Sequence, residues 1–156
     1  LFFENSTKSI FLEKGCVKRN IFSCLGPVNF GRKEFLLAYG RLFPLKKKMV
    51  FYEEVTSILE KAGKTVIEFS GIMANPTYEK VLEGAKIARE NEVDWILGIG
   101  GGSVMDCCKA VSLAAISKKD IWKEYWAKPG IIDFEPLPLG VIVTVAGTGS
   151  ECNGGA

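Results

Sequence analysis

The segment at residues 93–109 constrains the fold most strongly, because it joins two apolar runs through three consecutive glycines. The first run, residues 95–99, is short and is followed by glycine, which predicts a strand covered on both faces of a sheet. The second run, residues 104–116, is apolar on most sides, which predicts a packed helix. The turn between the two runs is Gly100-Gly101-Gly102-Ser103.

This turn predicts an anion site. Glycine has no Cβ, so the backbone can adopt positive φ and approach a ligand, and the unpaired N–H groups of the following helix point into the same space. Three adjacent glycines lose backbone entropy with no packing return, which favours a phosphate cradle over a plain tight turn. The alternative needs no ligand, because Ser103 and Asp106 also have the spacing of a capping box. The spacing matches neither the Gly-x-Gly-x-x-Gly dinucleotide fingerprint nor the phosphate loop of nucleoside triphosphatases.

The composition predicts one globular domain. The chain has 156 residues, of which 47% are hydrophobic, and this is enough for one core. Its 20 basic and 18 acidic residues give a formal charge of +2, so nothing favours nucleic acid or a membrane as a partner. No apolar segment approaches the roughly 18 residues that span a bilayer, and the residues after Leu1 have no signal-peptide pattern. We therefore expect a cytoplasmic protein.

Histidine is absent from the sequence, and the five cysteines show no Cys-x-x-Cys spacing. A zinc site is therefore not expected. Cys107 and Cys108 are neighbours on the predicted helix, which is typical of small core residues in a reducing compartment. Without histidine the chain lacks the commonest general base and metal ligand.

Strands and helices are predicted to alternate along the chain. Buried strands are expected at residues 35–39, 64–69, 95–99 and 140–144, with an edge strand or hairpin near residues 10–12. This alternation predicts the α/β class, with a Rossmann-like parallel sheet and helices on both of its faces. Ligands bind beyond the carboxyl ends of the strands in such sheets. The loops that leave those ends, near Gly40, Asn75, Gly100 and Thr144, are expected to converge on one ligand.

Local signals mark the ends of two further helices. Gly63 is expected to stop the first, and Thr77 is expected to cap the second, over residues 78–91. The lysine run at residues 46–48 is expected on a solvated loop, and the aromatic residues within 118–128 are expected to pack in the fold rather than to stack on a ligand. The buried faces of the two helices are expected at Val55, Ile58, Leu59 and Ala62, and at Val81, Ala85 and Ala88.

Three motifs, with their spacing, resemble a known family. They are Asn75-Pro76-Thr77, Gly100-Gly-Gly-Ser-x-x-Asp106-x-x-Lys109, and Thr144-x-Ala-Gly-Thr-Gly-Ser-Glu151-x-Asn-Gly-Gly155. Residues 35–156 resemble the amino-terminal half of the iron-dependent (group III) alcohol dehydrogenases, most closely their butanol dehydrogenase-like branch, and residues 4–10 resemble it more loosely. The resemblance implies that residues 1–156 form a dinucleotide-binding domain with the dehydroquinate synthase-like fold. It also implies that the family's carboxy-terminal helical domain is absent from this chain.

The resemblance further implies a site for a nicotinamide dinucleotide, either NADP or NAD. Gly101, Gly102 and Ser103 would bind the pyrophosphate, and Asp106 would lie near the nicotinamide. Residues on the loop after the last strand would contact phosphate or ribose through hydroxyl and amide groups, which add no buried charge. The whole expected cofactor site is Gly40, Asn75, Gly100, Gly101, Gly102, Ser103, Asp106, Thr144, Thr148 and Asn153.

The chain departs from that branch at two places. After Gly40 it continues Arg41-Leu-Phe-Pro-Leu45 in place of a glycine-rich turn, where the adenosine end of the cofactor would bind. The family's ligands for Fe²⁺ or Zn²⁺, an aspartate and three histidines, lie in and at the entry to the helical domain, so we expect no metal ligand and no catalytic residue here. The branch generally favours NADP, and the lysines at residues 46–48 are candidates for binding its 2′-phosphate.

Three functions remain open at this point. The first is the cofactor domain of a metal-dependent dehydrogenase that interconverts primary alcohols and aldehydes, with a homodimer as a candidate assembly and no turnover by this chain alone. The second is a glycerol or sugar-phosphate dehydrogenase, or a dehydroquinate synthase-like enzyme, on the same scaffold. The third is a stand-alone nucleotide-binding module or a non-catalytic remnant. The motif at residues 144–151 favours the first over the second.

Overall fold

The chain forms a parallel sheet of five strands. The structure, a computed structural model, describes residues 10–12, 33–40, 45–128, 131–145, 147–153 and 155–156. Within these residues the strand order is β1-β5-β4-β2-β3, and every neighbouring pair is parallel. The strands are β1 Ile10–Leu12, β2 Glu34–Gly40, β3 Thr65–Ile72, β4 Trp95–Gly100 and β5 Leu139–Val143.

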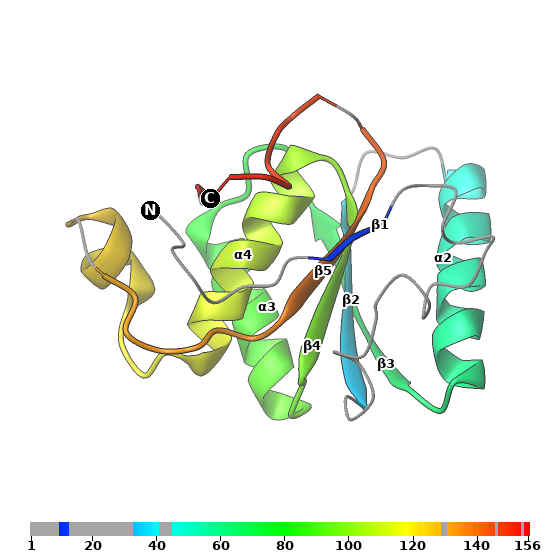
Figure 1. The fold of residues 1–156 in the computed structure, drawn as a ribbon, viewed down its shortest axis with the longest axis horizontal. Helices are drawn as coiled ribbons and strands as arrows, with labels where there is room; N and C mark the ends of the chain where they lie inside the picture. The colour runs from blue at the N-terminus through cyan, green and yellow to red at the C-terminus, as the bar shows by residue number, and fades with distance from the viewer. Residues whose placement is uncertain (1–9, 13–32, 41–44, 129–130, 146, 154) are drawn as a thin grey trace.

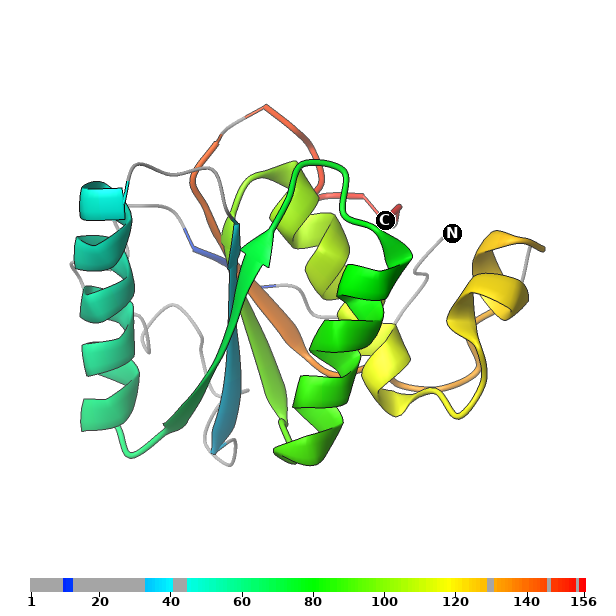
Figure 2. The same ribbon diagram turned by 180° about the vertical axis from the view of Figure 1, so that it is seen from behind.

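Helices cover both faces of this sheet. Figure 1 shows α2 on one side of the strands and α3 with α4 on the other, and Figure 2 shows the same layers from behind. The predicted Rossmann-like arrangement is therefore confirmed. The helices are α2 Leu45–Lys61, α3 Tyr78–Glu90 and α4 Gly102–Ile116, and a π-helical turn, η3, spans Trp122–Trp126.

Strand β4 lies in the middle of the sheet, and all of its residues are buried. Its side chains alternate between two hydrophobic clusters, as the period of a strand requires. Trp95 and Leu97 pack in the cluster beneath α2, whereas Ile96 packs in the cluster beneath α3 and α4. Burial on both faces explains why this strand is a continuous apolar run in the sequence.

The edge of the sheet is formed by β1, which pairs in parallel with β5 through Ile10 and Gly140. The prediction of an edge strand at residues 10–12 is confirmed, and the alternative of a hairpin is not supported by this parallel pairing. Cys107 and Cys108 are buried, which confirms that they are core residues. In the part of the chain that the structure describes, no helix has the length and hydropathy needed to cross a bilayer.

Two helix ends follow the predicted local signals. Gly63 ends α2 with φ of 71°, and the amides of Gly63 and Lys64 donate to the carbonyls of Glu60 and Leu59 at 2.9 and 3.0 Å. This is the Schellman pattern, which uses the left-handed conformation that glycine adopts at low cost. Thr77 caps α3 by accepting a hydrogen bond from the amide of Lys80 at 3.4 Å.

The buried faces of these helices are largely as predicted. Val81, Ala85 and Ala88 of α3 are buried. In α2, Val55 and Leu59 are fully buried and Ile58 is half-buried, but Ala62 lies beyond the end of the helix and is exposed.

The lysine run at residues 46–48 lies in the first turn of α2, so its expected position on a loop is wrong; residues 41–44 lie outside the described residues. That turn holds no acidic residue, and cations at the amino end of a helix oppose the helix dipole by about 0.3–1 kcal/mol each. Burial of an aliphatic side chain contributes about 1.5–3 kcal/mol. Val55 and Leu59 are fully buried against the sheet, so packing decides the conformation of this segment.

The contact of α3 with β3 and α4 depends on Gly84. A Cβ placed there would lie 2.8 Å from two ring atoms of Phe69 and 2.8 Å from Cγ2 of Val111. These distances are shorter than ordinary carbon contacts of about 3.5–4 Å. The missing side chain therefore sets how closely α3 approaches β3 and α4.

We predict that Gly84→Ala destabilises the fold, although alanine is the better helix former by about 1 kcal/mol. Overpacking of a filled core costs about 1–3 kcal/mol, and this exceeds the gain in helix propensity. Urea unfolding followed by circular dichroism should show a lower midpoint for Gly84→Ala. Lys86→Ala, on the exposed side of the same helix, is the matched control and should change stability by no more than about 0.5 kcal/mol. A midpoint for Gly84→Ala at or above that of the parent chain would contradict the steric argument.

Candidate functional site

The predicted glycine turn lies at the carboxyl end of β4, where the chain passes directly into α4. Gly101 is the N-cap residue, with extended backbone and no side-chain capping bond. Its carbonyl accepts hydrogen bonds from the amides of Val104 and Met105, both at 3.1 Å. The helix begins at Gly102, so Ser103 lies inside the first turn and the capping-box interpretation of Ser103 with Asp106 is wrong.

Close packing explains two of the three glycines. None of Gly100, Gly101 and Gly102 has positive φ, so the expectation of left-handed backbone in this turn is wrong. A Cβ on Gly100 would lie 2.5 Å from Cγ2 of Val104, and a Cβ on Gly102 would lie 3.0 Å from Oγ of Ser150. The premise that the glycines have no packing return is therefore also wrong.

Left-handed glycines do occur in the facing loop, which follows β5. Gly147 and Gly149 have φ of 92° and 70°. They bend the chain so that Val145 and Thr148 lie against the glycine turn: a Cβ on Gly101 would be 3.4 Å from Val145, and one on Gly102 would be 3.3 Å from Thr148. The turn and this loop together form the walls of a narrow site.

A pocket of about 250 Å³ lies between these walls. The first amides of α4 have no partner within the helix and carry the positive end of its dipole, so this pocket is suited to an anion. Ile72 and Met73, at the end of β3, close another side. Of the predicted site residues, those lining the pocket are Gly40, Gly100, Gly101, Gly102, Ser103 and Thr148.

Asn75 and Thr144 lie next to this pocket rather than in its lining. The amide of Asn75 donates to Oγ of Ser103 at 3.4 Å, and Asn75 has φ of 50°, which asparagine tolerates better than most residues. The amide of Thr144 donates to the carbonyl of Gly100 at 2.9 Å. Its hydroxyl is buried without a hydrogen-bond partner among the described residues, so a polar group remains available for a ligand.

Asp106 and Asn153 form a second group, held together by Lys109. The ammonium of Lys109 donates to Oδ1 of Asp106 at 3.3 Å and to Oδ1 of Asn153 at 2.9 Å. Asp106 does not line the first pocket but a second one of about 330 Å³, which also borders Tyr78 and Trp122. The structure therefore divides the predicted residues into two sets around the first turns of α4.

Sequence reasoning missed two residues of this second set. One is Lys109, whose i,i+3 spacing from Asp106 on a helix is a recognisable signal for an ion pair. Ser150 donates to Oδ2 of Asp106 at 3.3 Å, and no sequence signal predicts this contact across 44 residues.

Two buried thiols and one phenol near the site are poor acids. Burial raises the pKa of Cys107 to about 12, and burial also raises the pKa of Cys108 well above its ordinary value. The pKa of Tyr39 is raised to about 12, mainly by burial and to a smaller extent by the hydrogen bond that its hydroxyl donates to Glu68. These three groups are therefore uncharged at neutral pH and do not supply a nucleophile or a general base.

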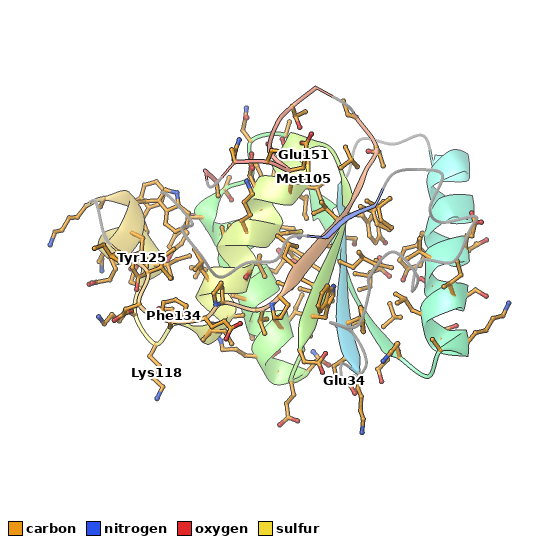
Figure 3. All side chains as sticks on the ribbon, viewed as in Figure 1. Glu34, Met105, Lys118, Tyr125, Phe134 and Glu151 are labelled. Atoms are coloured by element: carbon orange, nitrogen blue, oxygen red, sulfur yellow. The ribbon has the colours of Figure 1, made fainter. Side chains whose placement is uncertain are left out.

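No metal centre is formed by the described residues, because no group of three or more histidine, cysteine, aspartate or glutamate side chains lies together in them. Figure 3 shows two of the carboxylates at opposite ends of the strands. Glu151 is beside the amino end of α4 near Met105, and Glu34 is at the other end. The residues that the structure describes therefore do not fit the donor set of a metal ion.

Comparison with known proteins relates the sequence to one enzyme family. Residues 9–156 match the family model described as iron-containing alcohol dehydrogenase. The chain is 40% identical over 124 residues to a probable NADH-dependent butanol dehydrogenase of Bacillus subtilis, with 80% of this chain and 31% of that protein covered. It is 36% identical over 111 residues to the NADPH-dependent aldehyde reductase YqhD of Escherichia coli, with 70% of this chain and 28% of that protein covered.

A solved structure supports the relationship at the level of the fold. The crystal structure of NADH-dependent butanol dehydrogenase A from Thermotoga maritima superposes with a TM-score of 0.74 at 34% identity, covering 96% of this chain and 35% of that one. This chain thus spans about a third of the length of the relatives it matches. Together, the family match over residues 9–156 and the shared fold show that this chain belongs to the iron-containing alcohol dehydrogenase family.

Proposed function

We propose that residues 1–156 are a dinucleotide-binding domain of an NAD(P)-dependent dehydrogenase that interconverts primary alcohols and aldehydes. The observation that carries the proposal is the pocket at the amino end of α4, which is walled by glycine backbone and by the loop after β5. Helix amides favour anions, and the pyrophosphate of a dinucleotide is the anion that parallel α/β sheets bind at this edge.

The pyrophosphate is assigned to the amides of Gly102 and Ser103. Thr148 borders the same pocket, and Thr144, whose buried hydroxyl has no partner among the described residues, is bonded through its amide to Gly100 of the lining. Hydroxyl groups both donate and accept hydrogen bonds, so they suit phosphate and ribose oxygens without adding charge. Gly40 and Asn75 complete the rim of this part of the site.

Asp106 and Asn153 are assigned to the nicotinamide end of the cofactor, beside the second pocket. The dinucleotide supplies the hydride acceptor of the reaction when it is bound. We assign to this chain the role of binding and orienting it, because the phenol of Tyr39 and the buried thiol of Cys107 stay protonated at neutral pH and no cluster of three or more metal-ligating side chains lies among the described residues. Alcohol, aldehyde and the metal of the family belong to the whole protein, and we derive no step through the metal.

Gly101 offers the cleanest test of the cradle. Its extended backbone is one that valine also adopts, so Gly101→Val should fold. The added methyl groups would enter the space between the glycine turn and Val145, so we expect calorimetry to show NADH and NADPH affinities lower by at least about tenfold, or about 1.4 kcal/mol. Thr65→Val, at the opposite end of the sheet, is the matched control and should bind as the parent does. Binding by the parent chain that Gly101→Val leaves unchanged would overturn the assignment.

Cofactor preference tests the lysine run. Residues 46–48 lie at the start of α2, which follows the carboxyl end of β2 and so lies at the same edge of the sheet as the pocket. We propose that they attract the 2′-phosphate of NADP. Replacing all three lysines by glutamine should weaken NADPH binding several-fold more than NADH binding at low ionic strength, whereas Lys86→Gln should change neither. Equal losses for both cofactors would remove this role.

The isolated 156-residue chain is expected not to turn over alcohols. It contains no histidine, and the described residues hold no group that could bind a metal ion, whereas alkoxide formation in metal-dependent dehydrogenases relies on a Lewis acid. Oxidation of NADPH and NADH with butanal and added Fe²⁺ or Zn²⁺ should stay at the background rate. Metal-stimulated turnover by the purified chain would show that other side chains build a site.

A further inference from the structure

Lys109 is a buried cation whose hydrogen bonds join its own helix to the segment that contains Asn153 and Gly155. Its side chain is only 10% exposed. The ammonium donates to Asp106 on its own helix, to Oδ1 of Asn153 at 2.9 Å, and to the carbonyl of Gly155 at 2.6 Å. A buried ammonium is costly unless it is paired and hydrogen-bonded, so these contacts are mutually dependent.

Lys109 also determines how the amide of Asn153 is oriented. A lysine ammonium has three donors and no acceptor, so the atom of Asn153 that faces it at 2.9 Å must be the oxygen. The same oxygen accepts the amide of Gly155 at 3.1 Å. With its oxygen occupied twice, Asn153 has its NH₂ group left to offer to another molecule, and an NH₂ group donates to phosphate or ribose oxygens.

The segment held by Lys109 is continuous with the wall of the first pocket. Ser150 donates to Asp106 from the same segment, and its Oγ would be 3.0 Å from a Cβ on Gly102. Thr148, two residues earlier, borders that pocket. Gly147 and Gly149 carry no side chain that could anchor the loop. Its start is held by the amide of Thr144 on Gly100, and its far end by the contacts made at Ser150, Asn153 and Gly155.

We propose that Lys109 is a positioning residue of the dinucleotide site: with Asp106 it fixes residues 150–153 and Gly155 on α4, and so sets the loop after β5 and the amide of Asn153 for the cofactor. This role rests on the proposed function. It predicts that loss of the ammonium weakens cofactor binding through the loop, without any direct contact between Lys109 and the cofactor.

The test compares Lys109→Met with Lys80→Met. Methionine keeps most of the buried stem and removes the ammonium. Lys80 is the matched control because its side chain is 11% exposed and it also forms an i,i+3 ion pair, with Glu83 at 2.8 Å, but its ammonium lies over the ring of Phe69 in β3. We expect Lys109→Met to weaken NADH binding at least tenfold by calorimetry, and Lys80→Met to change it less than twofold.

A nitroxide on Cys152 measures the position of the loop directly. Cys152 is exposed, whereas Cys107 and Cys108 are buried, so a thiol reagent selects Cys152 once Cys16 and Cys24 are replaced by serine. Electron paramagnetic resonance should show a more mobile label in Lys109→Met than in the parent, and an unchanged label in Lys80→Met. A purely structural loss of stability would not separate the two variants in this way.

Ser150→Ala keeps the test decisive if Lys109→Met does not fold, because it removes the other hydrogen bond to Asp106 and leaves the buried cation paired. It should weaken NADH binding at least threefold and mobilise the label. Unchanged affinity in the folded variants, or equal losses in Lys80→Met and Lys109→Met, would overturn the role of Lys109. Failure of the parent chain to bind either cofactor would instead overturn the proposed function, and the role of Lys109 with it.

Discussion

The close approach of α4 to the sheet is the constraint on which the rest of the site depends. A Cβ on Gly98 would lie 3.1 Å from the sulfur of Cys108, and one on Gly100 would overlap with Val104, so at these two positions the side chains of α4 pack directly on the backbone of β4. This proximity lets the strand pass into the helix through a single residue, Gly101. The amino end of α4, with its unpaired amides, is thereby brought to the carboxyl edge of the parallel sheet.

Signals that are local in the sequence predicted local structure well. The apolar run of β4, the stop at Gly63 and the cap at Thr77 each depend on a few neighbouring residues, and the structure confirms all three. The capping-box alternative for Ser103 is wrong because the strand passes directly into the helix. Gly101 is the N-cap residue, so Ser103 already lies in the first turn of α4. The lysines of α2 were misjudged because burial of Val55 and Leu59, several residues away, decides their conformation.

The site was predicted as a single set of residues, and the structure arranges it as two. Six of the predicted residues line one pocket, while Asp106 borders another and joins Asn153 through Lys109. The reason for the glycine turn was also hidden from the sequence, since the atoms that exclude a side chain at Gly102 belong to Ser150 and Thr148, far along the chain. Contacts between distant segments are what a single sequence without relatives does not reveal.

The composition of the pocket walls also limits how the site can adapt. Glycine backbone forms one wall, and short side chains such as Thr148 and Val145 form the other. These two walls have few rotamers, so rotation of a long side chain cannot reshape them; the long, flexible side chain of the lining is Met73, on a third side. The distance between the glycine turn and the loop after β5 changes only when that loop moves. The fit between these two walls and a ligand therefore depends on backbone positions. A ligand that fits poorly would change the order of that loop.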